Sequence, residues 1–434
     1  MSKNTSVLLK YADKISPTSV SEYESVGGFT GIKHAVSMNK EEIIEEILRS
    51  NLKGRGGAAY PAGRKWRSLY HIEGSPKYIV CNADEGEPGT FKDRDLLEKT
   101  PLSVIEGMLI AGYVFDSPRG YIYIRGEYRN IQKIFQQAID EARNAGYLGN
   151  NILGIPDFNY DITIVSGGGA YVCGENSALL NSIEGKAGRP RIKPPHLAEV
   201  GLYQKPTLVN NVESFACIPV ILSEGSEAFL SYGTPESGGT KLVSISGHAK
   251  NRGVFEVGLG IPLRDLIMNE NYGGGILDGE LKFFHIGGQS GPIGFPEQLD
   301  ALYSYEDLAK IGLSIGSGAL VVLNDKVCLV EYIQKVFEFF VHESCGKCTP
   351  CRLGTTRILE LLTDFVEGRA KEGDVERLEY LSNQVSTLSA CGLGQSVNIA
   401  LNSCLKHRRE DFEAHIKNHG CPLCGGQEKT NRRN

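Results

Sequence analysis

Long apolar runs, a secretion signal and an excess of basic residues are all missing from this sequence. No uninterrupted apolar stretch of about 18 residues occurs, so we expect no membrane-spanning helix. The first residues, MSKNTSVLLKYADK, lack the apolar core and the small-residue cleavage site of a signal peptide. The 46 lysines and arginines are outnumbered by 52 acidic residues, and the formal net charge of -6 excludes a dominant nucleic-acid-binding surface.

Cysteine and glycine, in contrast, are plentiful. Because no secretion signal accompanies the 11 cysteines, we expect a cytoplasmic, reducing location, where cysteine clusters form metal or redox sites rather than disulfides. The 52 glycines fall in short clusters such as GRGG, SGGGA, YGGG and IGGQSG. Such clusters suit backbone that approaches a ligand closely or adopts a positive φ.

Strand and helix patterns alternate in the first half of the chain. Amphipathic patterns at 39–51 and 130–146 predict helices, and the apolar segment 101–115 predicts another, with a proline in its first turn. The β-branched and aromatic run GYIYIRGEY predicts a strand. This alternation indicates an α/β domain with crossover connections.

The length predicts about two to four domains. Short strands and turns after residue 240 predict a small mixed α+β domain, and the pattern is helical from Cys328 onward. We predict an extended lead-in at 1–40, a cofactor-binding α/β domain at 41–237, a small domain at 238–327, a helical domain at 328–415 and a tail at 416–434.

One loop between predicted helices, ESCGKCTPCRLG, contains Cys345, Cys348 and Cys351. Cysteine thiolates hold iron–sulfur clusters or zinc, and this run needs one more ligand from elsewhere. Cys391 in SACGLGQS stands among small residues that allow a close approach. Three close cysteines with one distant cysteine favour a cubane cluster over zinc, while zinc and unliganded buried cysteines are the alternatives.

The segment GRGGAAYPAGRKW formally matches the dinucleotide-binding pattern G-x-G-x-x-A. It follows a predicted helix rather than a strand, so we reject the standard Rossmann interpretation. Its backbone N–H groups and the positive side chains of Arg55, Arg64 and Lys65 suit phosphates or a flavin. A glycine-rich surface turn is the alternative.

Three further polar segments each have a cofactor-binding and a structural interpretation. The acidic segment CNADEGEPGTF follows a strand, and its carboxylates can accept hydrogen bonds from ribityl or ribose hydroxyls or form a solvated turn. SGGGAYVCGEN leads a strand into a helix N-terminus, where anions are favoured. Asn210 and Asn211 carry amides that can contact a flavin edge, and a helix N-cap is the compatible alternative.

Together and in this order, these segments with GRPRIKPP and KPTLVNNVE resemble one family over about residues 20–415. It is the FMN-bearing flavoprotein subunit of NADH dehydrogenases, including that of respiratory complex I. The family also includes the NADH-oxidising subunits of soluble hydrogenases, formate dehydrogenases and electron-bifurcating complexes. The resemblance implies an α/β FMN-binding domain, a ubiquitin-like β-grasp (SLBB-like) domain and an all-α [4Fe–4S] domain.

The resemblance also implies roles for individual residues. It places the cluster on Cys345, Cys348, Cys351 and Cys391, and it gives Glu87 a catalytic position near the nicotinamide. Its residues for FMN and NAD(P)H are Gly54, Arg55, Gly56, Gly57, Tyr60, Lys65, Asn82, Asp84, Glu85, Tyr171, Gly174, Glu175, Asn176, Lys193, His196, Asn210 and Asn211. Flavin is required because nicotinamide gives two electrons whereas the cluster accepts one.

The sequence departs from the family at the position of the adenosine. Asn176 stands where members commonly carry a second glutamate near the ribose, and His196 stands where a phenylalanine usually stacks on adenine. A missing carboxylate removes repulsion toward a 2′-phosphate, and Arg189 and Arg191 lie nearby in sequence. We hypothesise that NADP(H) is accepted, the alternative being NADH with Asn176 as a neutral variant.

The end of the chain, EAHIKNHGCPLCGG, has zinc-ligand spacing, with C-x-x-C after two histidines. We predict a zinc site on Cys328, His415, Cys421 and Cys424, with Cys404 as a substitute ligand. A tail with free cysteines is the alternative.

From these residues we predict an NAD(P)H:acceptor oxidoreductase subunit that passes single electrons from FMN through a [4Fe–4S] cluster. The expected setting is a soluble electron-bifurcating hydrogenase or transhydrogenase. The NADH-input subunit of complex I and a non-catalytic iron–sulfur scaffold without flavin are the alternatives. Expected partners are a [2Fe–2S] thioredoxin-like subunit, a further redox subunit and ferredoxin, with no nucleic acid and no direct membrane insertion.

Overall fold

The structure is a computed structural model that describes residues 6–424, and these residues form two compact units. The first unit extends to Ser244 and includes 254–261 and 302–306, whereas the second comprises 245–253, 262–301 and the chain from Asp307 onward. The division falls within strands β5 (Thr240–Gly247) and β6 (Gly253–Gly258).

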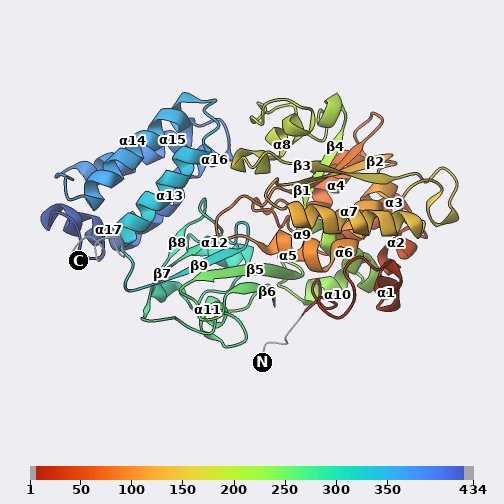
Figure 1. Cartoon of the computed structure of the whole chain (residues 1–434), viewed down its shortest axis with the longest axis horizontal. Coiled ribbons are helices and arrows are strands. Elements are labelled where there is room, and N and C mark those ends of the chain that lie inside the picture. The colour runs from red at the N-terminus through yellow and green to blue at the C-terminus, as the bar shows by residue number, and fades with distance from the viewer. Residues whose placement is uncertain (1–5, 425–434) are drawn as a thin grey trace. The chain divides into compact units, whose positions relative to one another are not determined.

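A parallel four-stranded sheet in the order β3-β2-β1-β4 forms the centre of the first unit (Figure 1). Its strands are β1 (Tyr78–Ala83), β2 (Arg119–Ile124), β3 (Asp161–Ser166) and β4 (Thr207–Asn211). The chain moves from β1 to β2 and β3 on one side and then returns to place β4 on the other. The order therefore reverses between β1 and β4, where α/β sheets bind ligands at the carboxyl ends of their strands.

Helices cover this sheet, and α6 and α9 both pack against β1. Residues of α6 are buried almost throughout, as expected for a helix that is apolar on all sides. The helices of the unit are α1 (Val20–Ser25), α2 (Thr30–Ala35), α3 (Lys40–Arg49), α4 (Ala62–Tyr70), α5 (Lys92–Lys99), α6 (Pro101–Val114), α7 (Arg129–Asn144), α8 (Asn176–Ile183), α9 (Val212–Glu224) and α10 (Ser226–Ser231), with 3-10 turns η1 (Ile152–Gly154), η2 (Tyr171–Gly174) and η3 (Leu202–Gln204). The α/β class predicted from the alternating pattern is confirmed.

The N-terminal segment differs from the expectation of an extended lead-in, which was wrong. It forms α1 and α2, and Tyr23, Phe29 and Ile32 are buried. Glu106 of α6 accepts hydrogen bonds from the Tyr23 hydroxyl (2.8 Å) and from the backbone N–H groups of Phe29 and Ile32 (both 3.0 Å). These helices are too short to be stable alone, so contacts with α6 decide their formation.

Strands β7 (Leu281–Ile286), β8 (Ile293–Gly294) and β9 (Ala319–Asn324) of the second unit pair antiparallel, with β7 in the middle. They belong to a five-stranded sheet in the order β6-β5-β9-β7-β8. Three short helical segments accompany them: α11 (Leu263–Met268), η4 (Pro296–Gln298) and α12 (Tyr305–Lys310). The predicted domain limits at 237, 327 and 415 stay predictions.

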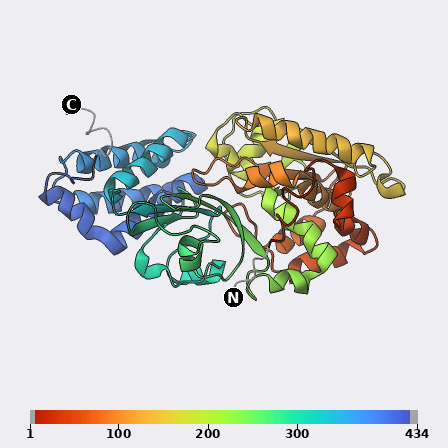
Figure 2. The ribbon, with the colours of Figure 1, turned by 60° about the horizontal axis from the view of Figure 1, so that its bottom comes forward.

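The C-terminal part of the second unit is helical, as predicted, and its four long helices pack into a bundle (Figure 1; Figure 2). Its helices are α13 (Leu329–Glu343), α14 (Thr349–Val366), α15 (Asp374–Leu388), the short α16 (Gly392–Gln395) and α17 (Val397–Lys417). Helix α13 contacts α14 and α17, and α15 contacts the same two helices. Within residues 6–424, no helix combines the length and apolarity that a membrane crossing requires.

Candidate functional site

Asn82 joins three distant segments at the carboxyl ends of β1 and β4. Its Nδ2 donates hydrogen bonds to the carbonyl oxygen of Gly174 (2.9 Å) and to Oδ1 of Asn176 (3.1 Å). Its own Oδ1 accepts from the backbone N–H of Asp84 (3.1 Å), and it lies opposite Asn211 in the sheet register. The structure thus brings together several of the predicted cofactor residues at the reversal point of the sheet.

The glycine loop between α3 and α4 approaches the same strand ends. A Cβ atom added to Gly56 would lie 3.0 Å from Cβ of Asn211, which is closer than ordinary side-chain packing allows. Gly57 has a φ of 126°, a conformation that strongly favours glycine. Because the loop follows a helix, the rejection of a standard Rossmann motif is confirmed.

Lys65 of α4 and the two asparagines at the end of β4 lie close to the same strand ends as the glycine loop. The Lys65 ammonium donates to the carbonyl oxygen of Val209 (2.9 Å), and burial together with the charge of Lys193 lowers the pKa of Lys65 to about 8. The Asn210 amide, oriented so that its oxygen accepts from the Trp66 indole N–H (3.0 Å), is directed toward α4. Asn211 caps α9, confirming the capping interpretation for that residue.

The start of α8 combines a carboxylate with a lysine. Glu175 accepts hydrogen bonds from the backbone N–H groups of Ser177 (2.9 Å) and Ala178 (3.0 Å), and its other oxygen pairs with Lys193 (3.1 Å). The Glu175 carboxylate therefore caps the N-terminus of α8, at which the sequence analysis predicted that an anion would be favoured. The side-chain oxygen of Asn176 accepts a hydrogen bond from Asn82. The NH2 group of the Asn176 side chain therefore faces away from Asn82.

The residues predicted to contact the nicotinamide nucleotide lie on more open parts of the unit. Tyr60 exposes 53% of its surface, and Lys193 is also exposed. Glu87, the predicted catalytic residue, accepts a hydrogen bond from the Tyr171 hydroxyl. The backbone N–H of His196 donates to the Glu199 carboxylate (2.8 Å), a contact that does not involve the imidazole.

Two predicted cofactor residues point into the protein instead. The Arg55 guanidinium is fully buried and donates to the carbonyl oxygen of Gly238 (2.7 Å) and to the Tyr305 hydroxyl (3.3 Å), so the expectation that it faces a phosphate was wrong. The Glu85 carboxylate accepts from the backbone N–H groups of Asp93 (2.7 Å) and Arg94 (3.1 Å) at the start of α5. Spacing along a loop does not show which side chain turns toward the core.

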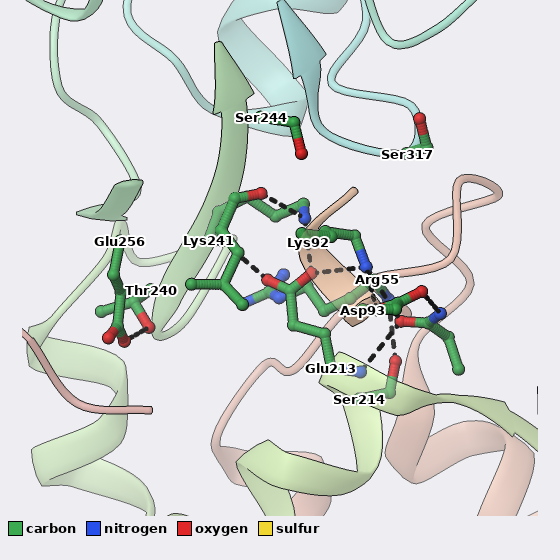
Figure 3. Close-up of polar contacts among 12 residues, drawn as sticks. Arg55, Lys92, Asp93, Glu213, Ser214, Thr240, Lys241, Ser244, Glu256 and Ser317 are labelled. Atoms are coloured by element: carbon green, nitrogen blue, oxygen red, sulfur yellow. Dashed lines mark hydrogen bonds and ion pairs between the residues drawn. The ribbon is translucent and has the colours of Figure 1, made fainter. Parts of the chain in front are cut away.

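A buried group of charges was missed by the sequence analysis (Figure 3), and two of its members contact Asn211. Lys92 contacts Asp93 (2.6 Å) and Glu213 (3.0 Å), and Lys241 contacts Glu213 (2.5 Å). Lys92 and Asp93 directly follow the acidic segment in FKDRD, the only sequence signal that could have indicated them. Charged residues are normally exposed, so the pattern alone favoured a solvated face.

The four cysteines predicted to hold the cluster belong to the helical part of the second unit. Cys348 and Cys391 immediately precede α14 and α16, where backbone N–H groups favour thiolates. Burial raises the pKa of Cys391, and the thiols of Cys345 and Cys348 raise it further, while N–H groups of α16 lower it. Cys351 is affected by the other three in the same way.

The segment that contains Cys391 packs closely against the segment that contains Cys345, Cys348 and Cys351. A Cβ added to Gly394 would lie 3.3 Å from Cβ of Cys351 and only 2.3 Å from the Ser389 hydroxyl, so glycine is required there. All 11 cysteines carry free thiols. Four neighbouring thiols with backbone N–H donors fit the chemistry of a [4Fe–4S] cluster.

A second group of ligating side chains lies elsewhere in this unit. The ligand atoms of Cys328, His415, Cys421 and Cys424 all lie within 4.8 Å of one another. Nε2 of His415 is 3.3 Å from the sulfurs of both Cys328 and Cys424. Its Nδ1 lies 2.6 Å from the carbonyl oxygen of Asp411, an arrangement that leaves Nε2 facing the two sulfurs. The structure thus groups the four predicted residues, whereas the substitute, Cys404, is outside this group.

The parallel sheet with polar residues at its strand ends and the four neighbouring cysteines of the helical region together define the class of iron–sulfur flavoproteins. The family description "Nuo51 FMN-binding domain" matches residues 47–220, and "NADH-ubiquinone oxidoreductase-F iron-sulfur binding region" matches residues 331–415. The glycine loop and the strand-end amides fit FMN in the first of these regions, whereas the N-terminus of α8 is capped by Glu175.

Relatives match over nearly the whole chain. The NADH-quinone oxidoreductase F 2 subunit of Rhizobium meliloti is 43% identical over 420 residues, covering 96% of this chain and 99% of its own. The NADP-reducing hydrogenase subunit HndC of Solidesulfovibrio fructosivorans is 42% identical over 409 residues, covering 94% and 83%. A crystal structure of NAD+-reducing [NiFe]-hydrogenase in the H2-reduced state has a TM-score of 0.83 at 32% identity, covering 95% of this chain and 67% of that chain.

The chain therefore belongs to the NADH-ubiquinone oxidoreductase F family of flavoproteins. It is an oxidoreductase subunit with an FMN-binding region and a [4Fe–4S]-binding region.

Proposed function

We propose that this chain oxidises NAD(P)H at FMN and passes the electrons singly through a [4Fe–4S] cluster to partner subunits. The observation that carries the proposal is the convergence of Asn82, Gly174, Asn211 and the glycine loop at the reversal point of a parallel sheet. FMN supplies the conversion from two-electron to one-electron chemistry.

Each part of the site has a task in this proposal. Backbone N–H groups of the glycine loop and the charge of Lys65 bind phosphate. The amides of Asn82 and Asn211 orient the flavin, because both are themselves held by hydrogen bonds. Glu87, held by Tyr171, positions the nicotinamide nucleotide, and Tyr60 shields it from water.

Anaerobic titration of the reconstituted protein with NADH and with NADPH tests this function. We expect loss of the oxidised flavin absorbance, followed by a reduced-cluster EPR signal. Gly56→Val should abolish FMN binding because the added methyl groups meet Asn211. Gly146→Ala should lose some stability, because its φ of 79° disfavours alanine, but should retain FMN, because the added Cβ meets nothing within 4 Å. A folded, colourless wild-type protein after reconstitution would instead support the non-catalytic scaffold.

Acceptance of NADP(H) is the finer part of the proposal. The amide of Asn176 replaces a carboxylate, and nearby Arg189, Lys193 and His196 supply positive or hydrogen-bonding groups. Arg191 does not contribute, because its guanidinium is held by Asn181, Gly201 and Glu184. This loss of one predicted phosphate ligand leaves the missing carboxylate as the main support.

Asn176→Glu should lower the preference for NADPH over NADH by more than tenfold in kcat/KM. Two like charges about 4 Å apart cost on the order of 4 kcal/mol at an effective dielectric near 20, and screening still leaves more than the roughly 1.4 kcal/mol behind a tenfold change. Asn176→Gln is the matched neutral control. A wild type that prefers NADH more than tenfold, with Asn176→Glu unchanged, would refute the hypothesis.

We also infer that Cys328, His415, Cys421 and Cys424 hold a structural zinc ion. Four nitrogen and sulfur ligands with no position left for substrate are typical of structural rather than catalytic zinc. The backbone contact of His415 with Asp411 supports this assignment.

We propose a soluble, cytoplasmic electron-bifurcating hydrogenase or transhydrogenase as the setting. The name of the hydrogenase subunit HndC supports this choice, whereas the name of the Rhizobium relative supports complex I as the alternative. The proposed partners are a [2Fe–2S] thioredoxin-like subunit and a further redox subunit, with ferredoxin as a candidate acceptor. The small sheet-containing region at 238–327 is proposed to be a β-grasp domain.

A further inference from the structure

Four charged side chains form a continuous buried network beside the strand ends. Lys92 at the start of α5, Asp93, Glu213 of α9 and Lys241 of β5 expose at most 4% of their surfaces. Both lysines contact the same atom, Oε2 of Glu213, at 3.0 Å from Lys92 and 2.5 Å from Lys241. Figure 3 shows the two lysines converging on this carboxylate. The two ammonium groups thus share this oxygen, and Lys92 has Asp93 as a second carboxylate partner at 2.6 Å.

The network continues directly into a residue of the candidate flavin site. Asp93 accepts from the Asn211 amide (2.7 Å), and Lys92 donates to the oxygen of the same amide (3.3 Å). Asn211 is therefore held at both ends of its amide by charged groups. A chain of contacts runs from Lys241 through Glu213, Lys92 and Asp93 to Asn211, and such networks transmit changes of charge.

Burying these charges does not by itself stabilise the folded protein. Removing charges from water costs several kcal/mol per ion, and well-packed apolar residues are often at least as stabilising. The other titratable or charged groups that face the network are Arg55, Cys81, Glu85, Cys217, Tyr303 and Tyr305, with Glu256 beyond Cys217. Arg55, Lys92 and Lys241 are the cations, and Asp93, Glu213 and Glu85 are the carboxylates that interact with them. Burial raises the pKa of Glu85 to about 7, so this carboxyl is only partly ionised around neutral pH. Loss of a proton from Lys241 makes the net charge of the network more negative by one unit.

Lys241 is the cation of the network that can lose a proton around neutral pH. Burial lowers the pKa of Lys241 to about 7 in spite of its contact with Glu213, and the charges of Lys92 and Arg55 add to the lowering. Burial also disfavours the charge of Lys92, but Asp93, Glu213 and Glu85 outweigh it and raise the pKa of Lys92. Around neutral pH, Lys92 therefore stays charged while Lys241 changes its protonation state.

We propose that Lys241 is a positioning residue and a redox-linked proton acceptor of the flavin site, acting through Glu213, Lys92 and Asn211. The proposal rests on the proposed function, in which FMN at the strand ends accepts hydride. Hydride transfer adds two electrons and one proton to FMN and leaves it one negative charge. One further proton from water then binds the neutral Lys241 amine, and both protons return to water when the electrons leave.

The sign of the effect follows from this added charge. A negative charge on the flavin stabilises the ammonium form, so the pKa of Lys241 rises above about 7 when FMN is reduced. Below pH 7 Lys241 is protonated in both redox states and takes up no proton. Between pH 7 and the higher pKa of the reduced state, reduction binds one additional proton, and the flavin midpoint potential falls more steeply with pH.

The test is the flavin midpoint potential measured against pH by spectroelectrochemistry on the FMN-loaded protein. Above about pH 7, the slope of the wild-type midpoint potential against pH should correspond to the uptake of up to one additional proton per two electrons. Lys241→Arg, which keeps the charge but does not titrate, should lack this increase while binding FMN normally. Lys241→Met should lack it and also bind FMN about tenfold more weakly, because Asn211 loses part of its support.

The control is Lys99→Met, which removes a half-exposed lysine of α5 that pairs with Asp95 and should leave the profile unchanged. If Lys241→Met does not fold, the comparison of wild type with Lys241→Arg still decides. Identical pH profiles in those two proteins would overturn the role of Lys241 while leaving the proposed function intact. A wild type that binds no FMN would overturn the proposed function itself.

Discussion

Cys391→Ser is expected to remove the stable [4Fe–4S] cluster while FMN stays bound. The other three ligands come from the loop before α14 and from the first turn of that helix, and the segment before α16 supplies the fourth thiolate. Iron content should fall from about four atoms per chain to near zero, because a cubane with three thiolates and a serine is held weakly. Iron and sulfide analysis with reduced-state EPR measures the loss, and flavin content measures the second half of the prediction.

Cys404→Ala provides the matched control, since this thiol is fully buried in α17 and belongs to neither group of ligands. The control should retain its iron. In the Cys391 variant, NAD(P)H should still reduce the flavin, but electrons should no longer reach a partner through the cluster. Retention of the iron together with an unchanged EPR spectrum would show that Cys391 is not the fourth ligand.

Cys328→Ser is expected to abolish zinc binding and to destabilise the helical part of the second unit. Cys328 precedes α13, whereas the other three ligands lie at the end of α17 and beyond it, so the metal would cross-link both ends of the helical region. Structural zinc sites contribute on the order of 10 kcal/mol of apparent binding free energy in small domains. Metal analysis should show about one zinc per chain in wild type and almost none in the variant.

Deletion of 416–434 should have the same effect on zinc, because it removes two of the proposed ligands. The unfolding temperature of the iron-loaded protein should fall in both variants and stay near wild type in Cys404→Ala. Zinc content that survives both changes, or a wild-type protein purified without zinc, would contradict the assignment.

Local structure could be predicted where a single segment carried its own signal. The stripe of α3 is buried at Ile43, Ile44 and Ile47, and Pro101 begins α6, because helix periodicity and the fixed φ of proline act within one element. The motifs that indicated the family were equally local. Their order along the chain was sufficient to place the protein among these iron–sulfur flavoproteins.

Positions that depend on a distant partner could not be predicted in this way. Helices α1 and α2 form because Glu106 accepts hydrogen bonds from this segment, and the 1–40 segment has too little periodicity to show it. The inward turn of Arg55 depends on the carbonyl group of Gly238, which is distant in sequence. A loop pattern records residue types but not the side on which each one meets the core.

By itself, then, the sequence determined the family, the alternating α/β pattern, the helical C-terminal region and the identity of the candidate ligating cysteines. Only the tertiary structure decided that Lys241 and Lys92 share one oxygen of Glu213 and that Cys328 meets His415. The physical reason is that hydrogen bonds and ion pairs act over about 3 Å. Periodicity shows which face of an element is apolar, but only folding shows which charged group from another element lies within that distance.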